Sequence, residues 1–332
     1  MTDLFGRLPG GEGVEAVKIA GHGLSARFLT YGATLQDLRL DGFDHSLVLG
    51  FDDLEGYLAH PDLYFGAMVG RYANRIGEGR AAIGGRECQL DRNFLERHLL
   101  HGGSEGSSRR NWRIAAHSGE EVTFIDTLPD GHMGFPGRLN VRVTFAVQPG
   151  PALSIRVEAE TDAETLCNFA HHSYFNLGGG PTVEGHLLQI AADHYLPVTD
   201  TLIPTGEVAP VDGMPFDFRI PVRLTADRLA TGYDHNFCLS PRRSDLRAVA
   251  WLASPDGALS MTIKTSEPGL QFYGGAAIST RHHGPHAGLA LEPQIWPDAP
   301  NHPHFPSALL RPGEIYAQHT LFAFAGERKQ DW

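Results

Sequence analysis

Short apolar runs recur along the whole chain, and their length and spacing predict β-strands. We expect strands at residues 24–30, 38–40, 46–49, 140–147, 153–159, 249–253 and 259–265. Several of these runs alternate, so that Val141, Val143 and Phe145 would share one face of a strand. This period of two is typical of strands that bury one face in a core.

Turn-forming residues separate these runs, whereas helical periodicity is scarce. The turn signals are Asp41-Gly42, Gln148-Pro149-Gly150 and Pro255-Asp256-Gly257, and an Asp-Gly pair between apolar runs favours a hairpin. Only residues 52–58 and 223–229 suggest short helices, and there is no internal repeat of about 20–50 residues. We therefore predict an all-β fold, either a sandwich or a barrel, with a few short helical turns.

The composition allows this fold to be a single domain spanning residues 1–332. Of the 332 residues, 42% are hydrophobic and 20% charged, so the chain can bury a large core without disulfides or metals. Large all-β folds often exceed about 200 residues as one unit. Cys88, Cys167 and Cys238 are widely spaced without a CxxC motif, which argues against a disulfide framework and fits a reducing compartment.

Charge and hydropathy exclude several classes of partner. The formal net charge is −12, which disfavours nucleic acid and anionic membranes as partners. No apolar run approaches about 18 residues, and no secretory signal follows Met1, so we expect a cytoplasmic protein. The sequence leaves monomer and homodimer open. Two arginine clusters are expected on solvated faces, the first also being a possible phosphate contact: Arg109, Arg110, Arg113 and Arg242, Arg243, Arg247.

Five segments carry dense polar and aromatic chemistry outside the obvious turns. They are residues 70–76 (GRYANRI), 100–103 (LHGG), 168–177 (NFAHHSYFNL), 232–237 (GYDHNF) and 291–301 (LEPQIWPDAPN). Such planar hydrogen-bonding groups suit a hydroxyl-rich ligand, because each buried hydroxyl requires its own donor or acceptor. Aromatic faces such as Trp296 or Tyr72 would cover the apolar side of a sugar ring.

These segments, in this order, resemble the galactose mutarotase (aldose 1-epimerase) family. The similarity runs from Tyr31-Gly32-Ala33 to the closing residues 310–316 (LRPGEIY) and so covers nearly the whole chain. Each motif is weak alone, but the ordered set that includes the HSYFNL run is specific. The resemblance implies a large antiparallel β-sandwich, the galactose mutarotase-like supersandwich, with its site in a cleft on one sheet.

The resemblance also implies roles for individual residues. Glu292 would be the general base and His172 the general acid. The contacts to the sugar hydroxyls would come from Asn74, Arg75, His101, Asp234 and Gln271. His171 stands where the family more often has Asn; if this segment is a strand, only one of His171 and His172 can face the cleft.

Interconversion of the α and β anomers of a free aldose needs one base and one acid beside the anomeric carbon. The C1 hydroxyl loses a proton while the ring oxygen gains one, the C1–C2 bond rotates, and the transfers reverse. An ionised carboxylate and an imidazolium suit these tasks, and no metal or other cofactor is required. We expect the negative charge of Asp234 to help keep His172 protonated.

Other interpretations of the same residues stay open. Taken alone, Glu292 fits an exposed strand residue and His172 a core histidine. The fold also suits an epimerase of hexose 6-phosphates with arginines at the cleft rim, or a non-catalytic sugar-binding module. Asp234 and Glu292 would also suit the carboxylate pair of a glycosidase. His282, His283 and His286, like His302 and His304, lack metal-site spacing, so we predict no metal site.

Overall fold

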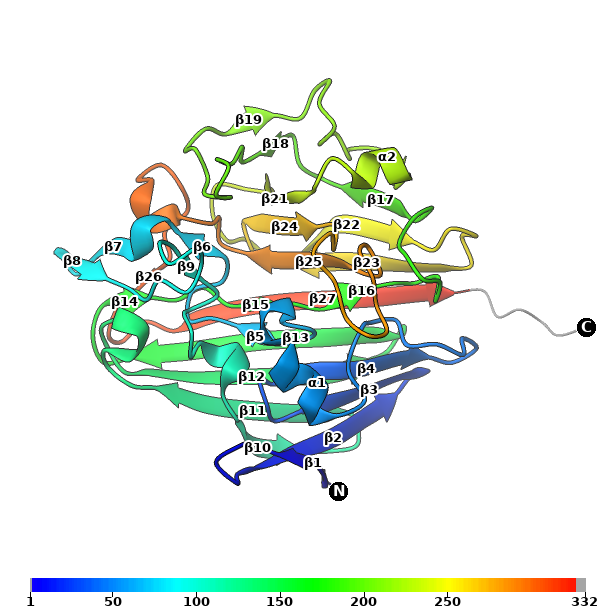
Figure 1. The fold of residues 1–332 in the computed structure, drawn as a ribbon, viewed down its shortest axis with the longest axis horizontal. Helices are drawn as coiled ribbons and strands as arrows, with labels where there is room; N and C mark the ends of the chain where they lie inside the picture. The colour runs from blue at the N-terminus through cyan, green and yellow to red at the C-terminus, as the bar shows by residue number, and fades with distance from the viewer. Residues whose placement is uncertain (1, 327–332) are drawn as a thin grey trace, which may run out of the picture.

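The computed structural model describes residues 2–326 and consists mainly of antiparallel strands. The largest sheet has nine strands, and Figure 1 shows its strand β27 crossing the middle of the molecule. In spatial order its strands are β10 (Arg113–His117), β11 (Glu121–Leu128), β12 (Leu139–Gln148), β13 (Ala152–Thr161), β27 (Tyr316–Gly326), β23 (Leu259–Thr265), β22 (Arg247–Ala253), β17 (Leu187–Ile190) and β20 (Val222–Arg223).

Two further sheets lie on either side of β27 in this view (Figure 1). A six-stranded sheet contains, in order, β16 (Tyr174–Phe175), β25 (Leu289–Gln294), β24 (Gly269–Tyr273), β21 (Asp234–Cys238), β18 (His194–Tyr195) and β19 (Ala209–Pro210). A four-stranded sheet contains β1 (Thr2–Arg7), β2 (Gly13–Gly21), β3 (Leu24–Leu29) and β4 (Thr34–Leu40).

Short ladders and single helical turns complete the fold. The ladders are β14 (Thr165–Leu166) with β26 (Leu309–Leu310), β15 (Ala170–His171) with β5 (Met68–Val69), β6 (Arg75–Ile76) with β9 (Leu99–Leu100), and β7 (Arg80–Ile83) with β8 (Arg86–Gln89). The helical turns are α1 (Leu54–Ala59), α2 (Ala226–Leu229), η1 (Pro61–Leu63), η2 (Gly77–Gly79), η3 (Ser107–Arg109), η4 (His132–Gly134) and η5 (Ala299–Asn301).

Most of the predicted strands are confirmed, but the strand at residues 46–49 is wrong. Only Val48 makes a bridge there, to Phe175. The Leu47 N–H donates to Leu38 on one side, and the Leu47 carbonyl accepts from Asn176 on the other. The segment therefore links two sheets and cannot continue a ladder with either.

Both predicted helices exist, but each begins later than predicted. The Asp53 carboxylate accepts the Gly56 N–H at 2.8 Å and starts α1, and the Thr225 hydroxyl accepts the Arg228 N–H and starts α2. Residue 52 therefore lies before the first helix. Arg223, the predicted start of the second helix, is the last residue of strand β20. Within residues 2–326, no helix is long and apolar enough to cross a membrane.

The core lies between the faces of the sheets, and the alternation of side chains decides what faces it. In β12 buried and less buried residues alternate along the whole strand. Every residue of β25 is buried, with Leu289 and Leu291 in the main hydrophobic cluster. Because neighbouring side chains on a strand point to opposite faces, Glu292 lies on the face away from this cluster.

Candidate active site

A cleft of about 530 Å³ lies over the face of the six-stranded sheet that carries Glu292. Antiparallel register brings its polar side chains together: Gln271 of β24 lies opposite Glu292 of β25 on one side and opposite Asn236 of β21 on the other. Asp234 lies two residues before Asn236 and so shares its face. Segments 74–75, 101 and 172 complete the cleft from outside this sheet.

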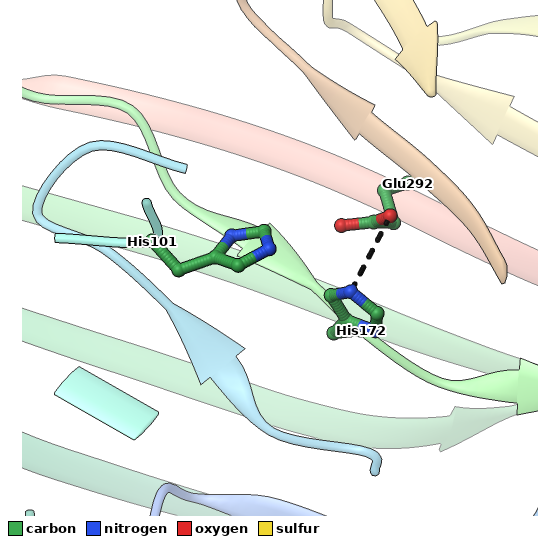
Figure 2. A group of neighbouring side chains, drawn as sticks. All are labelled: His101, His172 and Glu292. Atoms are coloured by element: carbon green, nitrogen blue, oxygen red, sulfur yellow. Dashed lines mark ion pairs between the residues drawn. The ribbon is translucent and has the colours of Figure 1, made fainter. Parts of the chain in front are cut away.

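Glu292 and His172 face each other at the base of the cleft. Glu292 Oε1 lies 3.7 Å from His172 Nε2, and both residues are buried, with 1% and 5% of their surfaces exposed. Figure 2 shows the carboxylate coming from a strand and the imidazole from a different segment, with the His101 ring facing the same space. Glu292 Oε2 and His172 Nδ1 have no hydrogen-bond partner among the described residues, so each is a buried polar atom whose hydrogen-bonding capacity is unused.

His101 is held through reciprocal hydrogen bonds with Asn74. The Asn74 N–H donates to His101 Nδ1 at 3.1 Å, and the His101 N–H donates to the Asn74 carbonyl at 3.0 Å. Gly102 follows with φ +85°, and a Cβ placed there would lie 1.9 Å from the Gly70 carbonyl oxygen. Only glycine allows this close backbone approach, which sets the direction of His101.

Arg75, Asp234 and Gln271 form one hydrogen-bonded network. Arg75 donates to Asp234 Oδ2 at 3.2 Å, and the Gln271 amide donates to Asp234 Oδ1 at 2.6 Å. The Arg75 guanidinium also lies 4.7 Å from the centre of the Phe94 ring. Gln271 itself is buried and does not line the cleft. The other residues that the family resemblance implicates all line it: Asn74, Arg75, His101, His172, Asp234 and Glu292.

Burial shifts the two groups of the Glu292–His172 pair in opposite directions. Loss of solvent raises the pKa of Glu292 well above its ordinary value, with a further contribution from Asp234. The same loss of solvent lowers the pKa of His172 to about 4, although Asp234 acts in the opposite direction. Asp234 therefore acts on His172 in the expected direction, but desolvation outweighs its charge and favours the neutral imidazole in the unliganded protein.

His101, His172 and Glu292 also have the spacing of a metal site. One ligand atom of each lies within 4.8 Å of the others. However, His101 Nδ1 accepts the Asn74 N–H, so a neutral His101 carries its proton on Nε2. This Nε2–H faces the cleft as a hydrogen-bond donor, which suits a hydroxyl ligand better than a cation. His282 and His283 instead line a different cavity of about 640 Å³.

The aromatic residues of the cleft are not those expected from the sequence. Tyr72 is buried and donates to the Trp296 carbonyl, and Trp296 donates to the Pro268 carbonyl, so both belong to a separate hydrophobic cluster. The rings that line the cleft are Tyr64, Phe94, Tyr174 and Tyr273. Tyr174 lay within a segment singled out above, whereas nothing in the local pattern distinguishes Tyr64 or Phe94.

His171 and the two arginine clusters lie outside the cleft lining. His171 points to the opposite side from His172, between the rings of Phe145 and Phe322. The expectation of solvated faces is wrong for Arg243, which binds the fully buried carboxylate of Glu267 at 2.6 Å. Arg109 binds Asp62 at 2.6 Å and Arg110 binds Asp126.

This fold places a buried carboxylate–imidazole pair beside further hydrogen-bonding side chains in one cleft of a β-sandwich, an arrangement typical of enzymes that act on hydroxyl-rich ligands. Comparison with known proteins identifies the family. The aldose 1-epimerase family profile matches residues 15–323. The chain is 42% identical over 338 residues to galactose mutarotase from Mus musculus, covering 97% of each, and 36% identical to aldose 1-epimerase from Escherichia coli, covering 92% and 93%.

A solved structure of an aldose epimerase homologue from C. elegans superimposes with a TM-score of 0.87 at 30% identity, covering 94% of this chain and 98% of that one. The chain therefore belongs to the aldose 1-epimerase family and is an isomerase acting on sugars. The predicted supersandwich is confirmed by this similarity.

Proposed function

We propose that the protein interconverts the anomers of a free, unphosphorylated aldose, with Glu292 and His172 exchanging protons with the sugar. The observation that carries this proposal is the 3.7 Å approach of Glu292 Oε1 to His172 Nε2 at the buried base of the cleft. A sugar bound there would present its C1 hydroxyl to the carboxylate and its ring oxygen to the imidazole. Both transfers would then occur without bulk water.

The proton count of the pair supports this assignment. Ring opening takes the C1 hydroxyl proton onto Glu292, forms the C1 carbonyl as the C1–O5 bond breaks, and moves a proton from His172 to O5. The pair thereby changes from carboxylate and imidazolium to carboxylic acid and neutral imidazole, with one proton throughout. Burial favours the second, uncharged form, which is the state reached when the ring is open. Closure on the other carbonyl face reverses both transfers.

The remaining polar groups support orientation of the sugar. His101 Nε2–H, Asn74 and Arg75 offer donors to hydroxyls, and Asp234 offers acceptor capacity. Gln271 acts through Asp234, whose Oδ1 it holds at 2.6 Å. Fixed contacts of this kind reduce the freedom that the reacting sugar must lose in the transition state.

The charges of the cleft favour a free sugar over a sugar phosphate. Among the described residues that line the cleft, the single arginine is Arg75, which is already bound to Asp234, while Asp62 and Glu292 add carboxyl groups and no cation. Arg109 is bound to Asp62 at the rim, and Arg110 is bound to Asp126. A phosphate would therefore meet no unpaired arginine among these groups. Comparing rates on glucose and glucose 6-phosphate tests this choice.

Polarimetry of freshly dissolved α-glucose and α-galactose tests the proposed roles directly. Glu292→Gln and His172→Asn should each lower kcat by at least about 10²-fold, since each removes one positioned proton-transfer group. Glu184→Gln, at an exposed position, is the matched control and should keep full activity. Circular dichroism should show that all three variants are folded.

Full activity in folded Glu292→Gln would contradict the role of the carboxylate. Tight binding of sugar without any acceleration by the unaltered protein would instead favour a sugar-binding module. Release of phenol from an aryl glycoside would favour a glycosidase, although both oxygens of Asp234 are already engaged by Arg75 and Gln271.

A further inference from the structure

One wall of the cleft is a short segment whose conformation is set from outside the catalytic pair. Asp62, Leu63 and Tyr64 all line the cleft. Tyr64 follows the single turn η1 and has φ 52° and ψ 25°. A bulky side chain rarely occupies this left-handed region, and such residues persist where surrounding contacts hold them. The contacts that hold Tyr64 therefore affect the shape of the cleft.

The Tyr64 ring contacts both imidazoles of the site. Its centre lies 4.6 Å from that of His101, in an edge-on arrangement, and 5.6 Å from that of His172. Tyr64 is only 8% exposed, so its ring separates these histidines from solvent on this side. Movement of the ring would change both the orientation of the imidazoles and their access to water.

The wall is attached at two points. On its C-terminal side the Gly66 N–H donates to the His172 carbonyl at 3.0 Å, and the His172 N–H donates to the Ala67 carbonyl at 2.9 Å. At the rim, Arg109 Nη2 binds Asp62 Oδ1 at 2.6 Å. The first attachment fixes the wall beside His172, and the second fixes its outer end.

Arg109 projects from a rigid base. It ends the turn η3, whose first residue, Ser107, is fully buried. The Ser107 hydroxyl donates to the Met68 carbonyl at 2.7 Å, and its N–H donates to the Gly70 carbonyl at 2.9 Å. Burial raises the pKa of the Tyr64 hydroxyl, while the nearby positive charge of the Arg109 guanidinium opposes this shift. Arg109 thus binds Asp62 directly and lies close enough to Tyr64 for its charge to act on that hydroxyl.

We propose that Arg109 is a positioning residue of the reaction: by holding Asp62, it keeps the wall and its Tyr64 ring closed against His101 and His172. This inference rests on the proposed function, because its readout is anomer interconversion. It adds a residue that touches neither the sugar nor the reacting atoms. The ion pair is partly exposed, with 84% of the Asp62 side chain accessible, so added salt should weaken it.

Arg109→Met and Asp62→Asn test this proposal by steady-state polarimetry. Each retains side-chain bulk but removes one charge. We expect kcat/KM to fall about threefold in Asp62→Asn, which loses only the ion pair. In Arg109→Met, which also removes the guanidinium charge beside the Tyr64 hydroxyl, the fall should be about tenfold. The double variant should be no worse than Arg109→Met, since both changes break the same contact. Arg109→Lys should recover part of the loss.

Arg110→Met is the matched control, because Arg110 is the next residue and binds Asp126 instead of the wall. It should keep full activity at unchanged fold. Activity in Arg109→Met and Asp62→Asn equal to that of the unaltered protein would overturn the proposal, and so would equal losses in Arg110→Met. If Arg109→Met fails to fold, Asp62→Asn at its exposed position decides the question by itself.

The two proposals fail in distinguishable ways. Absence of anomer interconversion in the unaltered protein would sink the proposed function and remove the basis of this inference. Normal activity in the unaltered protein together with normal activity in Asp62→Asn and Arg109→Met would sink only the role of Arg109. Loss of activity in Arg109→Met that Arg109→Lys partly restores, together with a fall in the activity of the unaltered protein on added salt, would support the inference, because a purely structural defect predicts neither response.

Discussion

At the scale of single residues, the proposed mechanism has the Glu292–His172 pair exchange protons with the sugar while its own proton count stays constant. The form with one proton is the form that can react. A second proton gives carboxylic acid and imidazolium and removes the base. Loss of the only proton leaves carboxylate and neutral imidazole and removes the acid. The pH dependence should therefore be bell-shaped, with limbs that belong to the pair.

The directions of the pKa shifts predict which group sets each limb. Starting from carboxylic acid and neutral imidazole, acidification adds a proton to His172, whose pKa burial has lowered to about 4. Alkalinisation removes the proton of Glu292, whose pKa burial has raised well above its ordinary value. We expect kcat/KM to hold its plateau as pH falls from 7 to 6, and to decline only nearer pH 4.

Initial-rate polarimetry across this range checks the prediction, corrected for the spontaneous rate in each buffer. Circular dichroism at each pH should separate titration of the site from unfolding. An acid limb centred near 6.5, the ordinary pKa of histidine, would contradict the assignment, because it would mean that His172 is not desolvated in the free enzyme.

At the scale of elements, a close contact between two backbone segments sets the position of His101. Gly102→Ala would place a Cβ 1.9 Å from the Gly70 carbonyl oxygen and 2.7 Å from the Arg71 nitrogen. Backbone atoms cannot yield as a flexible side chain can, so the loop must shift and take His101 with it. We expect kcat/KM to fall at least about tenfold and the free energy of unfolding to fall by about 2 kcal/mol or more.

Gly85→Ala is a control that isolates the cost of backbone conformation. Gly85 also has a positive φ, of +71°, but a Cβ there would meet no atom within 4 Å. It should lose about 1 kcal/mol of stability and no activity. Urea unfolding and polarimetry of both variants check the comparison, and equal effects in the two would mean that the contact with Gly70 is unimportant.

Alternation predicted the strands with one face in the core, such as β12 and β23, but not the strands that carry the site. In β25 the core face holds Leu289 and Leu291, while Glu292 and Gln294 occupy the other face, which is also buried. Polar residues buried by a cleft look like solvent-facing residues in a sequence. The sequence resemblance, and not the local pattern, therefore singled out Glu292. The position of Tyr64 depends on a loop conformation that no periodicity encodes.

At the scale of the whole molecule, the tandem His171-His172 links the cleft to the core between the sheets. His172 faces Glu292, while the ring of His171 lies between Phe145 of β12 and Phe322 of β27. Both ring nitrogens of His171 lack hydrogen-bond partners among the described residues. Burial lowers its pKa to about 3, with a further contribution from His172. Folding therefore requires a neutral imidazole at this position.

This requirement makes the stability of the protein sensitive to acid. A histidine with a lowered folded-state pKa stabilises the fold above its unfolded pKa of about 6.5, and this contribution is lost progressively as pH falls toward about 3. Between pH 7 and pH 5 the loss from His171 alone should be about 2 kcal/mol. His171→Asn removes the titrating group, so its free energy of unfolding should fall by about 2 kcal/mol less over this interval.

Urea denaturation at pH 7 and pH 5 measures this difference, and the slope with pH is the informative quantity. His171→Asn can be less stable at both pH values, because an amide in this apolar site also lacks partners. His194→Asn, at an exposed position on β18, is the control and should follow the unaltered protein. If His171→Asn lost as much stability between pH 7 and pH 5 as the unaltered protein, His171 would already be protonated or hydrated in the fold. The acid sensitivity would then have to come from other buried histidines, such as His101 and His186, whose pKa burial also lowers.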